Sequence, residues 1–225
     1  MKRVVIPELL DTDAGTPREV AGSLADIESL NKLLGGVNTM ASLLHTVATK
    51  RALPSLSWLD VAGARGGMAA SAVALLARRG LPVTPVLLDR AASHLNQDTT
   101  AVCGDALQLP FRDASFDVVG CCLFLHHLEP EEIVGFVNEA LRVARCAVLI
   151  NDLVRHPLHL LMARVGMPIY RSRLTRHDAP ASVRRSYTAV EMGEMLRSTR
   201  AQQVDVDESF FFRMGVIAWK RPNSI

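Results

Sequence analysis

The sequence predicts an α/β fold with a doubly wound, mostly parallel sheet of seven strands, and two observations support this. Five short apolar runs alternate with helix-forming stretches between residues 56 and 150, which is typical of a parallel sheet covered on both faces. Acidic residues follow four of these runs, at the carboxyl ends where such sheets bind ligands. These acids are Asp60, Asp89, Asp105 and Asp152.

The first predicted strand, residues 56–61, leads into a turn of small residues and then a helix over residues 67–79. Small side chains let the backbone approach a ligand closely, and the first N–H groups of the helix point at it. An acid at the end of the strand, in place of a phosphate-binding lysine, favours a ligand with hydroxyl or amino groups. The alternative for this turn is a plain strand-to-helix connection.

The other elements follow from apolar runs and from helix start and stop signals. Further strands are expected over residues 83–88, 100–103, 115–123, 147–150, 203–207 and 211–220, the last two as an antiparallel hairpin with Phe210, Phe211 and Phe212 in strand core. Further helices are expected over residues 17–34, 39–52, 91–95, 130–144 and 188–199. Residues 1–55 are therefore interpreted as an N-terminal helical cap and residues 56–225 as the ligand-binding domain.

Composition excludes several classes of protein. A net charge of +2 over 225 residues is too small to indicate a nucleic-acid partner. No apolar run reaches the roughly 18 residues of a membrane helix, and no signal-peptide pattern follows Met1. The four cysteines form no CxxC pair, so we expect buried thiols, a cytoplasmic location and no metal site.

Several short motifs at the strand ends carry a family resemblance. They are the loop at residues 60–67, Asp89, the Gly-Asp-Ala-Leu run at 104–107, an LPF-x-D-x-SFD-x-V pattern at 109–119, LHHL at 125–128 and LRV at 141–143. Together these resemble class I S-adenosylmethionine-dependent methyltransferases of the small-molecule, quinone-biosynthesis type, which have a Rossmann-like fold.

The resemblance implies that S-adenosyl-L-methionine is the cofactor. The positions that correspond to cofactor-binding residues are Asp60, Ala62, Gly63, Gly66, Asp89, Arg90, Gly104, Asp105, Ala106 and Leu123. A carboxylate at position 89 suits the two ribose hydroxyls, because it can accept two hydrogen bonds. Ala62 and Ala64 stand where the family has glycines, and alanine is costly at positive φ. The loop therefore avoids strain only if these two positions do not need a positive φ.

A narrower resemblance lies near the ends of the chain. Residues 7–11, 30–36 and 151–156 look like bacterial methyltransferases associated with type III polyketide synthases. This implies methyl transfer to a small-molecule acceptor, at a hydroxyl or carbon of a phenolic, quinone-like or polyketide compound. The alternative, prompted by the two alanines, is a catalytically degenerate S-adenosylmethionine-binding protein. The acceptor molecule and the oligomeric state stay open.

Three residues are candidates for the chemistry. His126 and His127 follow the fourth strand, and histidine suits a general base near neutral pH. His127 is favoured as the base; the alternative is that a histidine caps or packs against the next helix. Asp152 either orients a base or substrate or bonds to nearby backbone donors.

Residues 153–186 interrupt the alternation of strand and helix and are rich in arginine. Three interpretations stay open: a solvated basic face, a lid that binds an acidic substrate, and pairing with the acidic N-terminal segment. The second and third combine into one hypothesis, a basic lid insertion that closes over the site together with the N-terminal helices.

Overall fold

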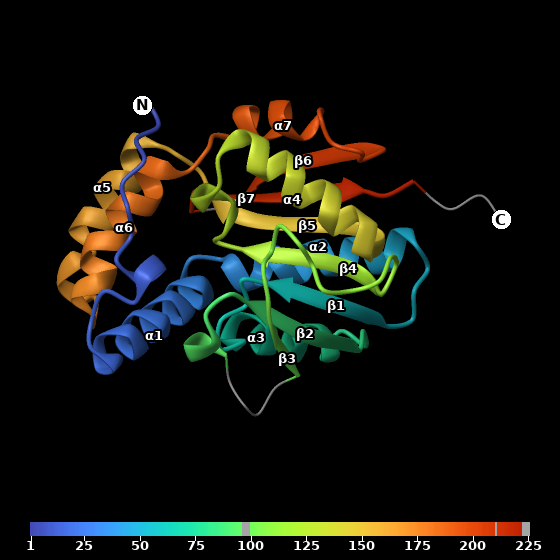
Figure 1. Cartoon of the computed structure of the whole chain (residues 1–225), viewed down its shortest axis with the longest axis horizontal. Helices are drawn as coiled ribbons and strands as arrows, with labels where there is room; N and C mark the ends of the chain where they lie inside the picture. The colour runs from blue at the N-terminus through green and yellow to red at the C-terminus, as the bar shows by residue number, and fades with distance from the viewer. Residues whose placement is uncertain (96–99, 210, 222–225) are drawn as a thin grey trace.

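The computed structural model describes residues 1–95, 100–209 and 211–221, and a single seven-stranded sheet runs through its centre (Figure 1). The strands are ordered β3-β2-β1-β4-β5-β7-β6, with β1 to β5 parallel and β7 antiparallel to both neighbours. They are β1 Leu56–Val61, β2 Val83–Asp89, β3 Ala101–Cys103, β4 Phe116–Cys122, β5 Ala144–Leu153, β6 Gln203–Ser209 and β7 Arg213–Trp219. The predicted fold class and the closing hairpin are confirmed.

Four of the helices in the described residues cover the two faces of this sheet, and three lie at one end of it. The helices are α1 Pro17–Leu33, α2 Gly36–Lys50, α3 Gly67–Ala77, α4 Pro130–Val143, α5 Pro157–Val165, α6 Arg173–Arg185 and α7 Ala189–Leu196. Helices α2 and α3 pack on one face and α4 and α7 on the other, so the core has two halves with Trp58 in one and Phe136 in the other. None of the helices in the described ranges is both long and apolar enough to cross a membrane.

Helices α1, α5 and α6 lie beyond the carboxyl ends of the parallel strands (Figure 1). Thr16 caps α1 through a capping box with Glu19, and Pro17 stands in the first turn. Residues 1–16, here called the N-terminal arm, run along α6, where Asp178 accepts hydrogen bonds from the backbone N–H groups of Leu9 and Leu10. Two segments distant in sequence therefore cover the ligand edge of the sheet together.

Some boundaries differ from the expectation. Strand β5 is longer than residues 147–150, because its polar end pairs with β7. Phe211 and Phe212 form a turn at positive φ before β7, so the prediction of strand core is wrong for them, and Phe210 lies outside the described residues. In place of the helix expected over residues 91–95, the structure has a short 3-10 turn, Ala92–His94. All four cysteines are free, but the prediction of buried thiols holds only for Cys121: Cys122 and Cys146 are half-buried and Cys103 is exposed.

Candidate functional site

The turn after β1 is left-handed at three positions. Ala62 has a φ of 57°, Ala64 of 44° and Gly66 of 75°. Both alanines therefore adopt the left-handed conformation, which costs about 1–2 kcal/mol for each non-glycine residue. Strain of this kind persists only where the surrounding structure enforces it, and it gathers at functional sites. Leu123, directly after β4, has a φ of 56° and adds a third strained position at the same edge.

The glycines of this turn allow close packing. A Cβ atom on Gly63 would lie 3.0 Å from the backbone oxygen and Oδ2 of Asp60, and one on Gly66 would lie 2.7 Å from Leu87 Cδ1. A Cβ on Gly67 would collide with the carboxylate of Glu28, which reaches over from α1. The start of α3 is thus already covered by an acidic side chain, as the positive end of the helix dipole favours.

Asp60 is buried beneath this turn. Its side chain is 1% exposed, and neither carboxylate oxygen has a hydrogen-bond partner among the described residues. Burial, with a further contribution from nearby Asp89, raises the pKa of Asp60 to about 8. A buried unpaired carboxylate gains a partner when a cation binds, so Asp60 fits the amino group of S-adenosylmethionine.

Asp89 bonds to the same turn from the end of β2. Its Oδ2 accepts the N–H of Ala64 at 3.1 Å and its Oδ1 that of Ala91 at 2.9 Å. Each oxygen keeps a second lone pair, so Asp89 can also accept hydrogen bonds from a diol. The carboxylate therefore shapes the turn and fits the expected ribose.

The other predicted cofactor positions lie on nearby loops. Gly104 donates its N–H to the Asp89 carbonyl, and Asp105, which is exposed, accepts the N–H of Leu107. Ala106 packs at the edge of the core. Arg90 points elsewhere, because its guanidinium reaches the carbonyl of Asp11 at 3.5 Å. The structure thus brings Asp60 and Asp89 to one turn, with the side chain of Arg90 directed to the N-terminal arm.

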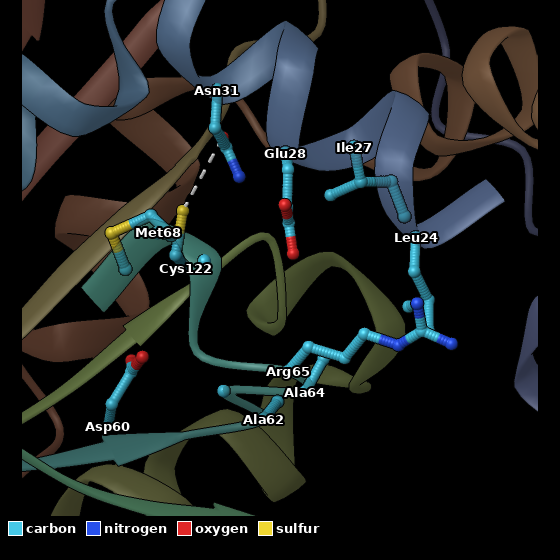
Figure 2. Close-up of a pocket in the computed structure, with 12 residues that line it drawn as sticks. Leu24, Ile27, Glu28, Asn31, Asp60, Ala62, Ala64, Arg65, Met68 and Cys122 are labelled. Carbon is cyan, nitrogen blue, oxygen red and sulfur yellow. Dashed lines mark hydrogen bonds between the residues drawn. The ribbon is translucent and has the colours of Figure 1, made fainter. Parts of the chain in front are cut away.

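A cavity of about 60 Å³ lies between α1 and the turn (Figure 2). Leu24, Ile27, Glu28 and Asn31 of α1 line one side, and Asp60, Ala62, Gly63, Ala64, Arg65, Gly67, Met68 and Cys122 line the other. Ligand pockets usually enclose roughly 300 Å³ or more, so this cavity is smaller than a typical site for a whole cofactor.

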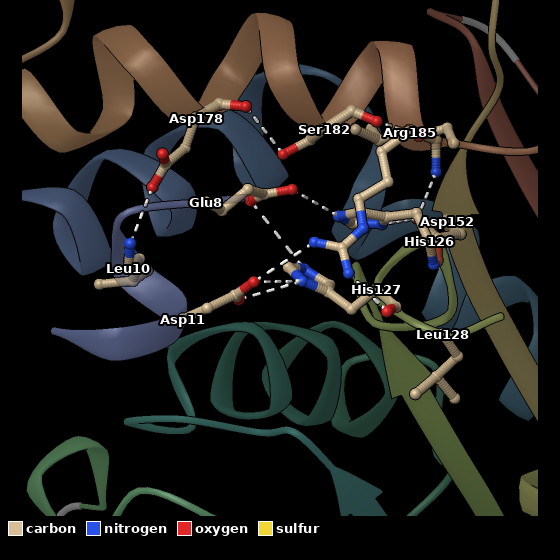
Figure 3. A network of polar contacts seen from close by, with 12 residues as sticks. Glu8, Leu10, Asp11, His126, His127, Leu128, Asp152, Asp178, Ser182 and Arg185 are labelled. Atoms are coloured by element: carbon tan, nitrogen blue, oxygen red, sulfur yellow. Dashed lines mark hydrogen bonds and ion pairs between the residues drawn. The ribbon is translucent and has the colours of Figure 1, made fainter. Parts of the chain in front are cut away.

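A second polar group lies at the ends of β4 and β5 (Figure 3). His126 Nδ1 lies 2.6 Å from Asp152 Oδ1, and Asp152 also accepts the backbone N–H of His126. His127 Nδ1 lies 3.0 Å from Asp11 Oδ1. Glu8 faces both imidazoles, with Oε1 3.6 Å from His126 Nε2 and Oε2 4.0 Å from His127 Nε2. We call these five residues the histidine cluster.

Contacts within the histidine cluster set its charges. Burial raises the pKa of Asp152, but the adjacent His126 lowers it more, so the pKa lies below its usual value. The pKa of Asp11 is also lowered, because hydrogen bonding and charge from His127, with Arg185, outweigh burial. Burial raises the pKa of Glu8 to about 7, against the opposing effects of His127 and Ser182.

The contacts of His126, His127 and Asp152 bear on the alternatives that the sequence leaves open for these residues. Glu129, rather than a histidine, caps α4. Asp152 contacts both the imidazole of His126 and backbone donors, so the two alternatives for this residue occur together. Glu8 carries no signal of a site residue in the sequence, because it lies 118 positions before His126 and no local pattern links the two.

Several arginines of residues 153–186 pair with acidic residues near the N-terminus. Arg173 Nε lies 2.5 Å from Glu19 Oε1, and Arg185 Nη1 lies 3.3 Å from Asp11 Oδ2. Asp26 accepts the backbone N–H groups of Arg171 and Ser172. These contacts hold α6 against α1 and the N-terminal arm, as the pairing hypothesis expects.

Comparison with known families and structures gives the assignment. Residues 59–147 match the family model of a methyltransferase domain. This range begins in β1, contains Asp60, Asp89, His126 and His127, and ends in β5.

Solved structures of low identity share the fold. The plantazolicin methyltransferase BpumL, in complex with a monoazolic desmethylPZN analog and SAH, is 14% identical, with a TM-score of 0.59, and the match covers 91% of this chain and 95% of that one. Magnesium protoporphyrin IX methyltransferase from Synechocystis PCC 6803, with bound SAH, is 14% identical, with a TM-score of 0.53 and coverage of 83% and 84%. A SAM-dependent methyltransferase from Aquifex aeolicus is 16% identical, with a TM-score of 0.50 and coverage of 74% and 82%.

The strand order, the acids at the strand ends and the domain match agree with one another. Residues 59–147 are therefore a methyltransferase domain by family match, and the chain as a whole has the fold of S-adenosylmethionine-dependent methyltransferases.

Proposed function

We propose that this enzyme methylates a hydroxyl group or carbon of a phenolic, quinone-like or polyketide small molecule. The histidine cluster carries the proposal, because an acceptor hydroxyl must lose a proton as it is methylated. The cluster lies at the ends of β4 and β5, next to the strand that carries Asp60. Cys122, which lines the cofactor pocket, is only four residues before His126.

In this proposal the cofactor supplies an electrophilic methyl group. Asp60, Asp89 and the strained turn bind the cofactor. His126 and His127 bind and activate the acceptor. The side chain of His127 is 22% exposed, against 3% for His126, so His127 is the more accessible of the two. In this proposal His127 is the general base that takes the proton of the acceptor hydroxyl. Asp152 fixes the ring of His126, as a carboxylate commonly fixes a catalytic imidazole.

We further propose that residues 153–186 and the N-terminal helices form a lid over the acceptor. The ion pairs between α6 and the acidic residues of α1 and the N-terminal arm support it. A substrate carboxylate would compete for Arg171, Arg173 and Arg176, so neutralising them should raise the Michaelis constant and weaken its dependence on salt. An unchanged Michaelis constant and salt dependence would reject the lid as a substrate-binding element.

The test begins with calorimetric titration of S-adenosylmethionine and S-adenosylhomocysteine into the wild-type protein and Asp89→Ala. We expect binding in the wild type that the variant loses. A screen of phenols and polyketide pyrones then follows methyl transfer, with His127→Ala as the active-site variant and exposed His45→Ala as its control. Binding without transfer to any acceptor would instead match a degenerate site.

A further inference from the structure

We infer that Glu8, His126 and His127 form a binding site for a divalent transition-metal ion such as Zn²⁺. The cysteine pattern predicts no metal site, and this group contains no cysteine. Two imidazole nitrogens and one carboxylate make a donor set that zinc commonly takes, with one further position open.

The distances fit two ligands on one ion better than they fit hydrogen bonds. Glu8 oxygens lie 3.6 Å from His126 Nε2 and 4.0 Å from His127 Nε2, beyond the range of a direct hydrogen bond. The three ligand atoms all lie within 4.8 Å of one another. Ligands of a tetrahedral zinc ion lie roughly 3.3–3.6 Å apart, given bonds of about 2.0–2.2 Å. A small inward movement of the side chains would therefore complete the coordination.

The opposite nitrogen of each imidazole contacts a carboxylate. His126 Nδ1 lies 2.6 Å from Asp152, and His127 Nδ1 lies 3.0 Å from Asp11. A ring that donates its Nδ1–H keeps the lone pair on Nε2, and both Nε2 atoms face Glu8. Metal-bound histidines nearly always have such a carboxylate or carbonyl partner, which fixes the tautomer and the direction of the ring.

Glu8 itself indicates a missing partner. The residue is 8% exposed, and Oε1 has no hydrogen-bond partner among the described residues. A buried carboxylate oxygen without a donor is costly, and a cation at the centre of the group would remove that cost. This observation is independent of the arrangement of the two histidines.

The position of Glu8 is set by the chain around it. Asp178 on α6 accepts the backbone N–H groups of Leu9 and Leu10, at 2.8 and 3.0 Å, directly after Glu8. The N-terminal arm is thus fastened to α6 at the point where it supplies the third ligand. A ligand held this way does not have to be ordered when the ion binds.

The open position suits an oxygen ligand, from water or from the hydroxyl of the acceptor. In this respect the inference rests on the proposed function, since the ion would hold the acceptor oxygen beside the cofactor site. With the ion bound, His127 Nε2 would be a ligand and could not take the proton, so the ion would replace His127 in activating the acceptor hydroxyl by lowering its pKa, and the proton would pass to solvent.

The experiment uses the full chain without an affinity tag, stripped with a chelator and titrated calorimetrically with Zn²⁺ in the absence of cofactor and acceptor. We expect one saturable site per chain. Glu8→Gln and His127→Ala should weaken binding by about 100-fold or more, and Asp152→Asn by about 10–100-fold, because it loosens a ligand without removing it. Exposed His45→Ala is the matched control and should bind as the wild type does. Circular dichroism establishes that each variant is folded.

Co²⁺ provides a second readout. Intense visible absorption of the bound ion, lost in Glu8→Gln, would indicate four-coordinate binding at this group. Wild-type protein that takes up neither ion in a saturable way would overturn the inference. Equal losses in His45→Ala and His127→Ala would also overturn it, because the ion would then bind elsewhere.

Methyl transfer by stripped and by zinc-reconstituted enzyme separates this inference from the proposed function. Transfer that persists in stripped enzyme, with no zinc binding, overturns the metal site and leaves the proposed function standing. Zinc binding without methyl transfer to any acceptor supports the metal site and overturns the proposed function.

Discussion

The cavity beside α1 and the histidine cluster each include a buried aspartate at the end of a strand, but only one of the two aspartates has hydrogen-bond partners among the described residues. Asp152 bonds to an imidazole and to backbone N–H groups, and its pKa is lowered. Asp60 has neither, and its pKa is raised to about 8. The first carboxylate therefore stabilises the fold and fixes the geometry of a neighbour. The second is kept unpaired at a cost in stability, which suits a group whose partner arrives with a ligand.

The largest expected effect comes from removing the paired carboxylate. Asp152→Ala leaves the imidazole of His126 without its partner in a site that is 2% exposed or less. We expect a loss of about 3 kcal/mol in the free energy of unfolding, as for other broken buried pairs. Urea unfolding measures it, with exposed Asp207→Ala as the control. A loss no larger than that of the control would show that the pair does not stabilise the fold.

Asp60→Asn should raise the free energy of unfolding, whereas Asp152→Ala should lower it. Unfolded, this group ionises near 3.8, whereas the folded protein retains the proton up to about pH 8, so Asp60 lowers stability progressively as pH rises between these values. At pH 8 the variant should be more stable by about 1–3 kcal/mol, while binding S-adenosylmethionine less tightly. Thermal unfolding at pH 5 and pH 8 tests this. A variant equally destabilised at both pH values would contradict the assignment of an unpaired acid.

The unpaired acid should also make cofactor binding depend on pH. Below about pH 8, Asp60 must release its proton to receive a cationic amino group. Affinity should therefore rise with pH between 6 and 7.5, by at most tenfold per unit, or about 1.4 kcal/mol. Calorimetry in buffers of different ionisation enthalpy measures the proton released. Binding with no proton exchange in this range would mean that Asp60 does not meet the amino group.

The smallest expected effect concerns the strained turn. Ala64→Gly relieves the left-handed φ but makes the unfolded chain more flexible, so we expect a net gain of about 0.5–1 kcal/mol. Ala70→Gly, on the exposed side of α3, should instead lose about 1 kcal/mol. Comparing the two variants by urea unfolding isolates the contribution of φ. Equal losses in both would show that the alanine fits the turn without strain.

The sequence predicts the sheet better than the site, for physical reasons. Apolar runs and capping residues act locally, so β1 and the capping boxes of α1 and α7 lie where their residues indicate. The carboxyl end of β5 is polar and is a strand because it pairs with β7, which comes later in the chain. A search for apolar runs therefore misses this part of the strand. The φ angles of Ala62 and Ala64 are imposed by the surrounding fold rather than by residue type. Glu8 reaches the histidines only through the path of the N-terminal arm, which depends on contacts with α6.

The position of Glu28 over Gly67 has a consequence for the timing of catalysis. Glu28 covers the start of α3 and the cavity beside it is small, so we expect α1 to move outward when the cofactor binds; the chain segment just before α1 carries Asp11 and Glu8. The N-terminal arm and α1 would therefore control the entry of the cofactor and also supply residues to the acceptor site. We expect an ordered kinetic sequence in which S-adenosylmethionine binds first, and in which the reopening of these two segments sets the pace of product release.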